Sequence, residues 1–251
     1  MTRHIVLIHG AWQGAWAFDA WLPLLRERGW QPHAVDLPGN GWPPLGDAPA
    51  SLDSYTAHVA GVIDALGEPA VVLGHSGGGI TASQVAEALP ERVAALVYLA
   101  GMMLPSGVGF GELVRQVHAE QPDRDFSGIT PWLQWNADRS ASRVPADGAL
   151  RCFVHDCEPA AAAQAAALLR PQPESGRAMI NRLSAERFGR VPRFYVECLD
   201  DRSVYHPLQA RMQQLSPGAH RLTLPCGHVP QLAAPQALTD LLMPELEALL
   251  P

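Results

Sequence analysis

The chain has 251 residues, of which 47% are hydrophobic, and its 25 acidic against 18 basic side chains give a net charge of −7. All of the basic side chains are arginine, which excludes Schiff-base chemistry, and without any basic block we expect neither nucleic acids nor membrane surfaces as partners. The four cysteines show no C-x-x-C spacing, and no apolar run is long enough for a signal sequence or a membrane span. These features predict a cytoplasmic protein of one large domain without disulfides.

Strands and helices alternate through the first hundred residues. Short apolar runs that end in glycine or a turn predict buried strands, and apolar positions spaced three and four residues apart predict helices. The strands are expected over residues 4–10, 31–36, 70–74 and 93–99, and the helices over residues 18–29, 52–66 and 80–89. A turn-rich stretch over residues 37–44 follows the second strand. This alternation predicts a parallel sheet with helices on both faces.

The alternation stops between residues 102 and 190. This segment has no convincing central strand, is rich in aromatic side chains and contains an alanine-rich helix over about residues 159–170, so we interpret it as an inserted helical cap. Strands over residues 193–199 and 221–224 and helices over residues 208–215 and 235–250 then resume the pattern. We therefore predict an α/β core with a six-stranded parallel sheet over residues 1–101 and 191–251, and a helical cap over residues 102–190.

The sequence GHSGG at residues 74–78 lies between the third predicted strand and its helix. A strand, a tight turn with the pattern G-x-S-x-G and a helix form a nucleophile elbow, which holds the serine hydroxyl above the sheet in a strained backbone conformation. Gly74 and Gly78 remove side chains that would collide in this turn. Ser76 is therefore the predicted nucleophile.

A serine nucleophile needs a histidine base and a carboxylate that orients the base. In elbow enzymes the carboxylate and then the histidine follow the serine, at the carboxyl ends of the last strands. Asp200 and Asp201 follow the fifth predicted strand, and His228 follows the sixth in a glycine-containing loop. We predict His228 as the base, in preference to His206 and His220, and Asp201 as its partner, with Asp200 as the alternative.

The negative oxygen of a tetrahedral intermediate needs two fixed N–H donors. Gly77, directly after the nucleophile, is the first predicted donor, and Ala11, in the loop after the first strand, is the second. No metal-binding pattern is present in the sequence. The residues predicted to line the substrate pocket are Gly10, Trp12, His75, Trp132 and Val229.

Taken together, four stretches resemble the hydroxynitrile lyase and plant methylesterase branch of the α/β-hydrolase superfamily, which has bacterial carboxylesterase members. They are VLIHGAWQGAW near the N-terminus, GHSGG at the elbow, LLRPQP at residues 168–173 and GHVPQL in the last loop. The resemblance implies a six-stranded fold with a helical cap, catalysis without a cofactor, and frequent dimers. It matches the triad to Ser76, Asp201 and His228 and the oxyanion donors to Ala11 and Gly77.

Three positions distinguish lyases from esterases in this branch. The lyases have a threonine where this chain has Gly10, a glutamate where it has His75, and a lysine that receives the cyanide charge where it has Val229. All three positions favour ester hydrolysis, so we predict a serine carboxylesterase acting on small to medium apolar or aromatic esters. The alternatives are a hydroxynitrile lyase, a lactone or thioester hydrolase, and a ligand receptor with slow turnover.

Overall fold

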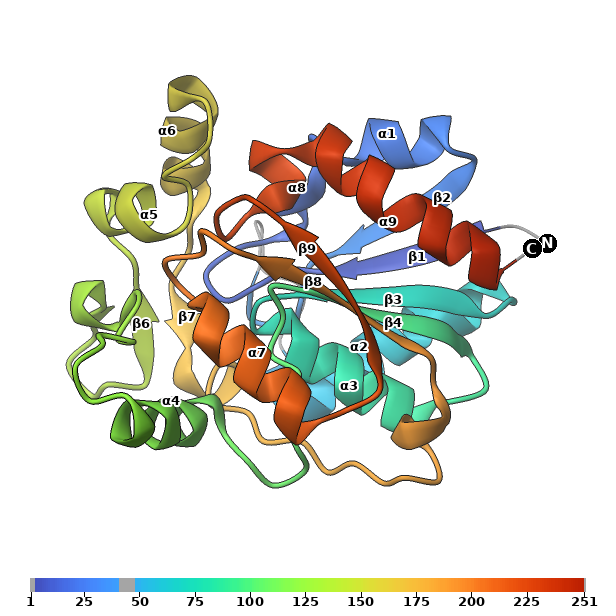
Figure 1. Cartoon of the computed structure of the whole chain (residues 1–251), viewed down its shortest axis with the longest axis horizontal. Coiled ribbons are helices and arrows are strands. Elements are labelled where there is room, and N and C mark those ends of the chain that lie inside the picture. Colours follow the sequence, from blue (N-terminus) through green and yellow to red (C-terminus); the bar gives the residue numbers. More distant parts are fainter. Residues whose placement is uncertain (1–2, 41–47, 251) are drawn as a thin grey trace.

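The computed structural model describes residues 3–40 and 48–250, and a six-stranded parallel sheet lies at its centre (Figure 1). In spatial order the strands are β2 (Trp30–Val35), β1 (Arg3–Ile8), β3 (Ala70–His75), β4 (Val93–Leu99), β8 (Arg193–Cys198) and β9 (Ala219–Leu224). Every neighbouring pair is parallel, so the C-terminal ends of all six strands meet at one edge. The predicted sheet is confirmed, while residues 41–44 of the predicted turn-rich stretch lie outside the described residues.

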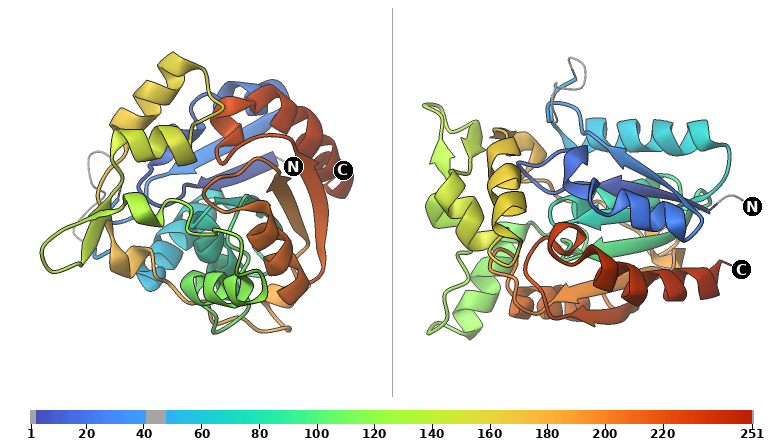
Figure 2. Two further views of the ribbon diagram at one scale, coloured as in Figure 1. Left: turned by 60° about the vertical axis from the view of Figure 1, so that its left-hand side comes forward. Right: turned by 90° about the horizontal axis from the view of Figure 1, so that it is seen from above.

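Helices cover both faces of this sheet (Figure 2). Those on one face are α1 (Leu22–Glu27) and α9 (Pro235–Leu249), and those on the other are α2 (Leu52–Leu66), α3 (Gly78–Ala88) and α7 (His206–Leu215). Leu25 and Leu242 are buried in the cluster on the first face, and Ile63, Ile80 and Leu208 in the cluster on the second. Both faces of each central strand are therefore apolar, as in other parallel sheets.

Local sequence sets where the helices begin and end. The Ser51 hydroxyl accepts the Ser54 N–H and the Ser54 hydroxyl accepts the Ser51 N–H, a capping box that begins α2, and Gly67 ends α2 with a φ of 73°. The helix expected over residues 18–29 is shorter, with a 3₁₀ helix at Ala15–Phe18 followed by α1. Pro23 explains the difference, because proline lacks an N–H and fits only the first turn of an α-helix.

The elements of residues 110–173 lie over the C-terminal edge of the sheet, at the left of Figure 1. The helices are α4 (Phe110–Glu120), α5 (Ala146–Cys152) and α6 (Pro159–Leu168), and the strands are β5 (Gln134–Trp135), β6 (Ala141–Arg143) and β7 (Gln172–Pro173). The three strands form an antiparallel sheet that the sequence analysis did not predict. Strands of two or three residues are too short to show a two-residue periodicity.

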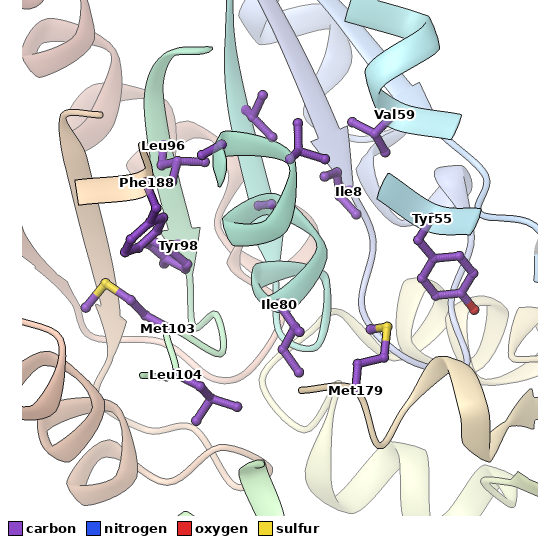
Figure 3. Packing of buried hydrophobic residues seen from close by; sticks show 14 of the residues in the cluster. Ile8, Tyr55, Val59, Ile80, Leu96, Tyr98, Met103, Leu104, Met179 and Phe188 are labelled. Carbon is purple, nitrogen blue, oxygen red and sulfur yellow. The ribbon is translucent and has the colours of Figure 1, made fainter. Parts of the chain in front are cut away.

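Buried side chains join the segment 102–190 to the core. Met179 and Phe188 belong to the same hydrophobic cluster as Ile8 and Ile80, and Figure 3 shows these side chains around α3. A separate cluster joins Trp12, Val229 and other core residues to cap side chains such as Phe153. Among the described residues, no helix has the length and apolar character that crossing a membrane requires.

Candidate active site

Ser76 lies in the tight turn between β3 and α3. Its φ of 52° is in the left-handed region that non-glycine residues rarely adopt. A Cβ on Gly74 would lie 2.6 Å from backbone atoms of Gly78, and a Cβ on Gly78 would lie 2.5 Å from the Ile8 carbonyl oxygen. Only glycine therefore fits at either position. The Met102 N–H donates to the Ser76 carbonyl at 2.8 Å, which fixes the turn from the other side.

His228 and Asp201 form a buried pair in the loops that follow β9 and β8. The His228 Nδ1–H donates to Asp201 Oδ2 at 2.8 Å, which leaves Nε2 as the accepting nitrogen of the neutral ring. Asp201 Oδ1 accepts the backbone N–H groups of Ser203 at 2.7 Å and Val204 at 2.9 Å, and Gln209 Nε2 donates to Oδ2 at 3.2 Å. Four hydrogen bonds thus fix the carboxylate that orients His228.

The other candidate acids and bases lie elsewhere. The Asp200 side chain is exposed, whereas Asp201 is buried. His206 begins α7, two residues before the helix expected over residues 208–215, because the following proline fits the first turn of a helix. His206 Nε2 lies 3.2 Å from Glu197, and His220 Nε2 in β9 lies 3.5 Å from Glu245. The structure thus brings Asp201, not Asp200, to His228.

His75, directly before Ser76, joins the elbow to the His228 loop. It is fully buried, its Nε2–H donates to the His228 carbonyl oxygen at 2.7 Å, and its Nδ1 lies 3.0 Å from Gln13 Oε1. Burial, together with the neighbouring His228, lowers the pKa of His75 well below 6.5. In the described part of the chain the Ser76 hydroxyl has no hydrogen bond to His228, and such bonds often form only when substrate is bound.

Two backbone N–H groups lie beside Ser76, the predicted nucleophile. A Cβ on Gly77 would lie 3.7 Å from the Ala11 nitrogen, which places the two residues next to each other. Among the described residues, neither the Ala11 N–H nor the Gly77 N–H donates a hydrogen bond within the chain. Gly10 packs closely behind them, because its Cβ would lie 2.9 Å from the Ser76 Cβ. Two free N–H groups next to a strained serine can bind an oxyanion.

A cavity of about 500 Å³ opens at this point and is lined by Ser76, Ala11 and Gly77. One part of its wall is apolar and comes mainly from residues 110–180; the side chains there include Phe110, Phe126, Ile129, Met179 and Ile180. Another part is polar and contains Arg177 and Glu174, which pair through two hydrogen bonds of 2.7 Å. This volume is typical of sites for small organic molecules.

The five residues predicted to line the pocket are distributed differently. Gly10 and Trp12 do line the large cavity. His75 is not among the lining residues, because it is fully buried beneath the His228 loop. Trp132 packs against Gly148 within the cap, and Val229 faces a separate cavity of only about 10 Å³. Of the five, only Gly10 and Trp12 therefore belong to the lining of this cavity, and His75, Trp132 and Val229 do not.

Several residues that contact the loops carrying Ala11 and His228 were not predicted from the sequence. The Phe153 ring stacks on that of His228 with centroids 5.4 Å apart, and Asp156 Oδ2 accepts the Gly227 N–H at 2.6 Å. Gln172 Oε1 accepts the Trp12 N–H at 3.2 Å. Only Gln172 lies in a motif that the sequence analysis singled out; nothing local marks Phe153 or Asp156. The described residues contain no group of three or more metal-ligating side chains.

Comparisons with known proteins agree with this fold. The profile of the alpha/beta hydrolase family matches residues 5–241. The chain is 28% identical over 247 residues to putative methylesterase 11 of Arabidopsis thaliana, a chloroplastic protein. The aligned region covers 96% of this chain but only 63% of that longer relative. The chain is also 27% identical over 247 residues to a pyrethroid hydrolase of Sphingobium wenxiniae, and the aligned region covers 94% of this chain and 85% of the relative.

Two solved structures have the same fold as this chain. The crystal structure of a pyrethroid hydrolase superposes with a TM-score of 0.85 at 26% sequence identity, over 99% of this chain and 98% of the other. That of polyneuridine aldehyde esterase, 24% identical, superposes with a TM-score of 0.80 and supports the fold alone.

Proposed function

The chain belongs to the alpha/beta hydrolase family, and on that premise we propose that it is a serine carboxylesterase whose nucleophile, base and orienting acid are Ser76, His228 and Asp201. Its similarity to methylesterases and to a pyrethroid hydrolase supports hydrolysis of carboxylic esters. The observation that carries the residue assignment is the position of Ser76 at an elbow, next to two free backbone donors and a cavity of about 500 Å³, with the buried His228–Asp201 pair joined to the elbow by the hydrogen bond from His75 to the His228 carbonyl oxygen.

In the first half of the reaction the Ser76 oxygen attacks the ester carbonyl carbon while His228 Nε2 takes the hydroxyl proton. The carbonyl oxygen becomes negatively charged and accepts hydrogen bonds from the Ala11 and Gly77 N–H groups. When the tetrahedral intermediate collapses, the bond to the alcohol oxygen breaks and His228 gives its proton to the leaving alcohol. The product is an acyl-enzyme on Ser76.

In the second half a water molecule replaces the alcohol. His228 takes a proton from the water, the resulting hydroxide attacks the acyl carbon, and the carboxylic acid leaves as Ser76 regains its proton. Asp201 stays ionised throughout, because its role is to hold the imidazole in the required tautomer and to stabilise the imidazolium that forms twice per cycle.

The cavity supports an ester of medium size with an apolar or aromatic group. Its apolar wall would bury such a group, and each buried methylene contributes about 0.8 kcal/mol, or roughly a fourfold change in kcat/KM. Lyase chemistry has less support, because the residue after His228 is the apolar Val229, which is 2% exposed and could not receive the charge of a cyanide ion.

The test compares wild type with Ser76→Ala on a series of nitrophenyl esters from acetate to octanoate, together with labelling by a fluorophosphonate and mass spectrometry. We expect turnover that rises with acyl length, a label on Ser76 and neither result in the variant. A wild-type protein that is labelled on Ser76 but hydrolyses the esters only very slowly would indicate a receptor, or an enzyme that cleaves a lactone or thioester. Cyanide release from a cyanohydrin would indicate a lyase. If it neither labels nor hydrolyses, the proposal is wrong.

A further inference from the structure

The oxyanion donor Ala11 lies in a turn whose conformation is unusual for its sequence. The Gln13 N–H donates to the Gly10 carbonyl at 3.3 Å, which closes a four-residue turn, and Trp12 occupies its third position with a φ of 64°. Turns with a positive φ at the third position normally place glycine or asparagine there. A bulky residue adopts this conformation only where its neighbours impose it.

The residues that hold Trp12 in its left-handed conformation belong to the cap. The Trp12 N–H donates to Gln172 Oε1 at 3.2 Å, its indole Nε1–H donates to the Ser142 carbonyl at 3.2 Å, and its carbonyl accepts the Arg170 N–H at 2.9 Å. The ring also stacks on Phe153 with centroids 6.0 Å apart. These partners lie more than 120 residues away in the chain, on or next to β6, β7 and α5.

Gln172 is itself fixed in place. Its side chain is 1% exposed, and its Oε1 also accepts a hydrogen bond from Asn40 Nδ2 at 2.9 Å. Its Nε2 donates to the Pro173 carbonyl at 3.2 Å and to the Tyr55 hydroxyl at 3.4 Å. The amide of Gln172 therefore has a single orientation, with its oxygen directed at the turn. Of these three hydrogen-bond partners of Trp12, Gln172 is the one that accepts the backbone N–H, and it does so with its side-chain oxygen.

We propose that Gln172 is a positioning residue for the oxyanion hole: by holding Trp12 in its left-handed conformation, this cap side chain directs the Ala11 N–H at the reacting carbonyl oxygen. The cap then sets the geometry of the catalytic machinery in addition to covering the substrate. The inference rests on the proposed esterase function. Because a misplacement of about 1 Å can cost on the order of 100-fold in rate, loss of this contact is expected to lower kcat by 10- to 100-fold.

The test compares Gln172→Met, which removes the acceptor at nearly constant volume, with Gln172→Glu, which keeps an acceptor oxygen. The matched control is Gln134→Met, because Gln134 is an exposed glutamine of the same cap sheet whose side chain, in the described part of the structure, bonds only to Arg143. We expect Gln172→Met to lower kcat 10- to 100-fold with KM within twofold of wild type. Gln172→Glu should recover most of the loss, and Gln134→Met should match wild type.

A second readout separates oxyanion geometry from general loosening of the site. A trifluoromethyl ketone captures Ser76 as a tetrahedral adduct whose oxygen carries the negative charge, whereas the matching methyl ketone binds without that charge. In Gln172→Met the inhibition constant of the trifluoromethyl ketone should rise by about the same factor as kcat falls, while that of the methyl ketone stays within twofold. Should Gln172→Met not fold, Gln172→Asn replaces it, since its amide is one methylene too short to reach the Trp12 N–H.

Several results would overturn the inference. They are a kcat within threefold of wild type in Gln172→Met, an equal loss of affinity for both ketones, and a similar loss in Gln134→Met. The proposed function is tested separately by the wild-type protein. A wild type that hydrolyses no ester and takes up no fluorophosphonate overturns both proposals, whereas an active wild type with an unaffected variant overturns only this one.

Discussion

Replacing Gly74 by alanine tests whether the shape of the elbow, and not only its serine, is needed for activity. The new Cβ would lie 2.6 Å from the Gly78 carbonyl group and from the Gly79 Cα, while ordinary contact begins near 3.4 Å. The start of α3 must therefore move by about 0.8 Å. That movement carries Gly77, whose N–H is the proposed oxyanion donor, and we expect kcat to fall on the order of 100-fold.

The same crowding lowers stability, because overpacking a well-packed site costs about 1–3 kcal/mol. The matched control is Gly61→Ala on the exposed side of α2, where a Cβ would meet nothing within 4 Å. There alanine should stabilise the helix by about 1 kcal/mol, or raise the melting temperature by about 2–4 °C, without changing kcat. Ester hydrolysis and thermal unfolding of both variants provide the measurement. A Gly74→Ala protein with wild-type kcat and melting temperature would refute the argument.

Three further predictions concern the triad, a buried histidine and the packing of α9. Asp201→Asn should lower kcat about 10³- to 10⁴-fold, because an amide no longer selects the required tautomer of the base, whereas Asp200→Asn should have little effect; equal losses in the two would contradict this. Burial depresses the pKa of His75, so below about pH 6.5 the unfolded chain binds a proton that the folded chain does not. Stability should therefore fall with falling pH, by up to about 1.4 kcal/mol per pH unit, and urea denaturation at pH 5, 6 and 7 should show a flatter profile in His75→Gln. Thr239→Val removes the acceptor of the buried Trp21 indole N–H, 2.9 Å away, and should cost about 1–3 kcal/mol in denaturant unfolding with kcat unchanged; an unaltered midpoint would exclude this bond as a stabilising contact.

Much of the core could be predicted because its signals are local. Each central strand is an apolar run a few residues long, and each crossover helix repeats its apolar positions within one or two turns. Ser51 and Gly67, which begin and end α2, are readable for the same reason. The elbow motif is also local: Gly74 and Gly78 lie within five residues of each other, and a Cβ on Gly74 would collide with Gly78 itself, although a Cβ on Gly78 would collide with Ile8 of β1.

The choice between Asp200 and Asp201 could not be made from the local sequence. Both residues follow β8, and the sequence left Asp200 as an alternative. In the structure Asp201 Oδ1 is held by the N–H groups of Ser203 and Val204, which turns Oδ2 toward His228. That selection depends on the path of the loop after the strand, and therefore on how α7 packs against the sheet.

The sequence by itself thus determined the α/β core, its six strands, the elbow at Ser76 and the set of candidate partners, because periodicity and turn chemistry act over a few residues. Only the tertiary structure decided which candidates meet, that His75 lies beneath the His228 loop rather than in the cavity, and that Gln172 of the cap contacts Trp12. The physical reason is that these contacts join residues up to 160 positions apart. Their formation depends on the packing of the cap over the sheet, which no short-range pattern encodes.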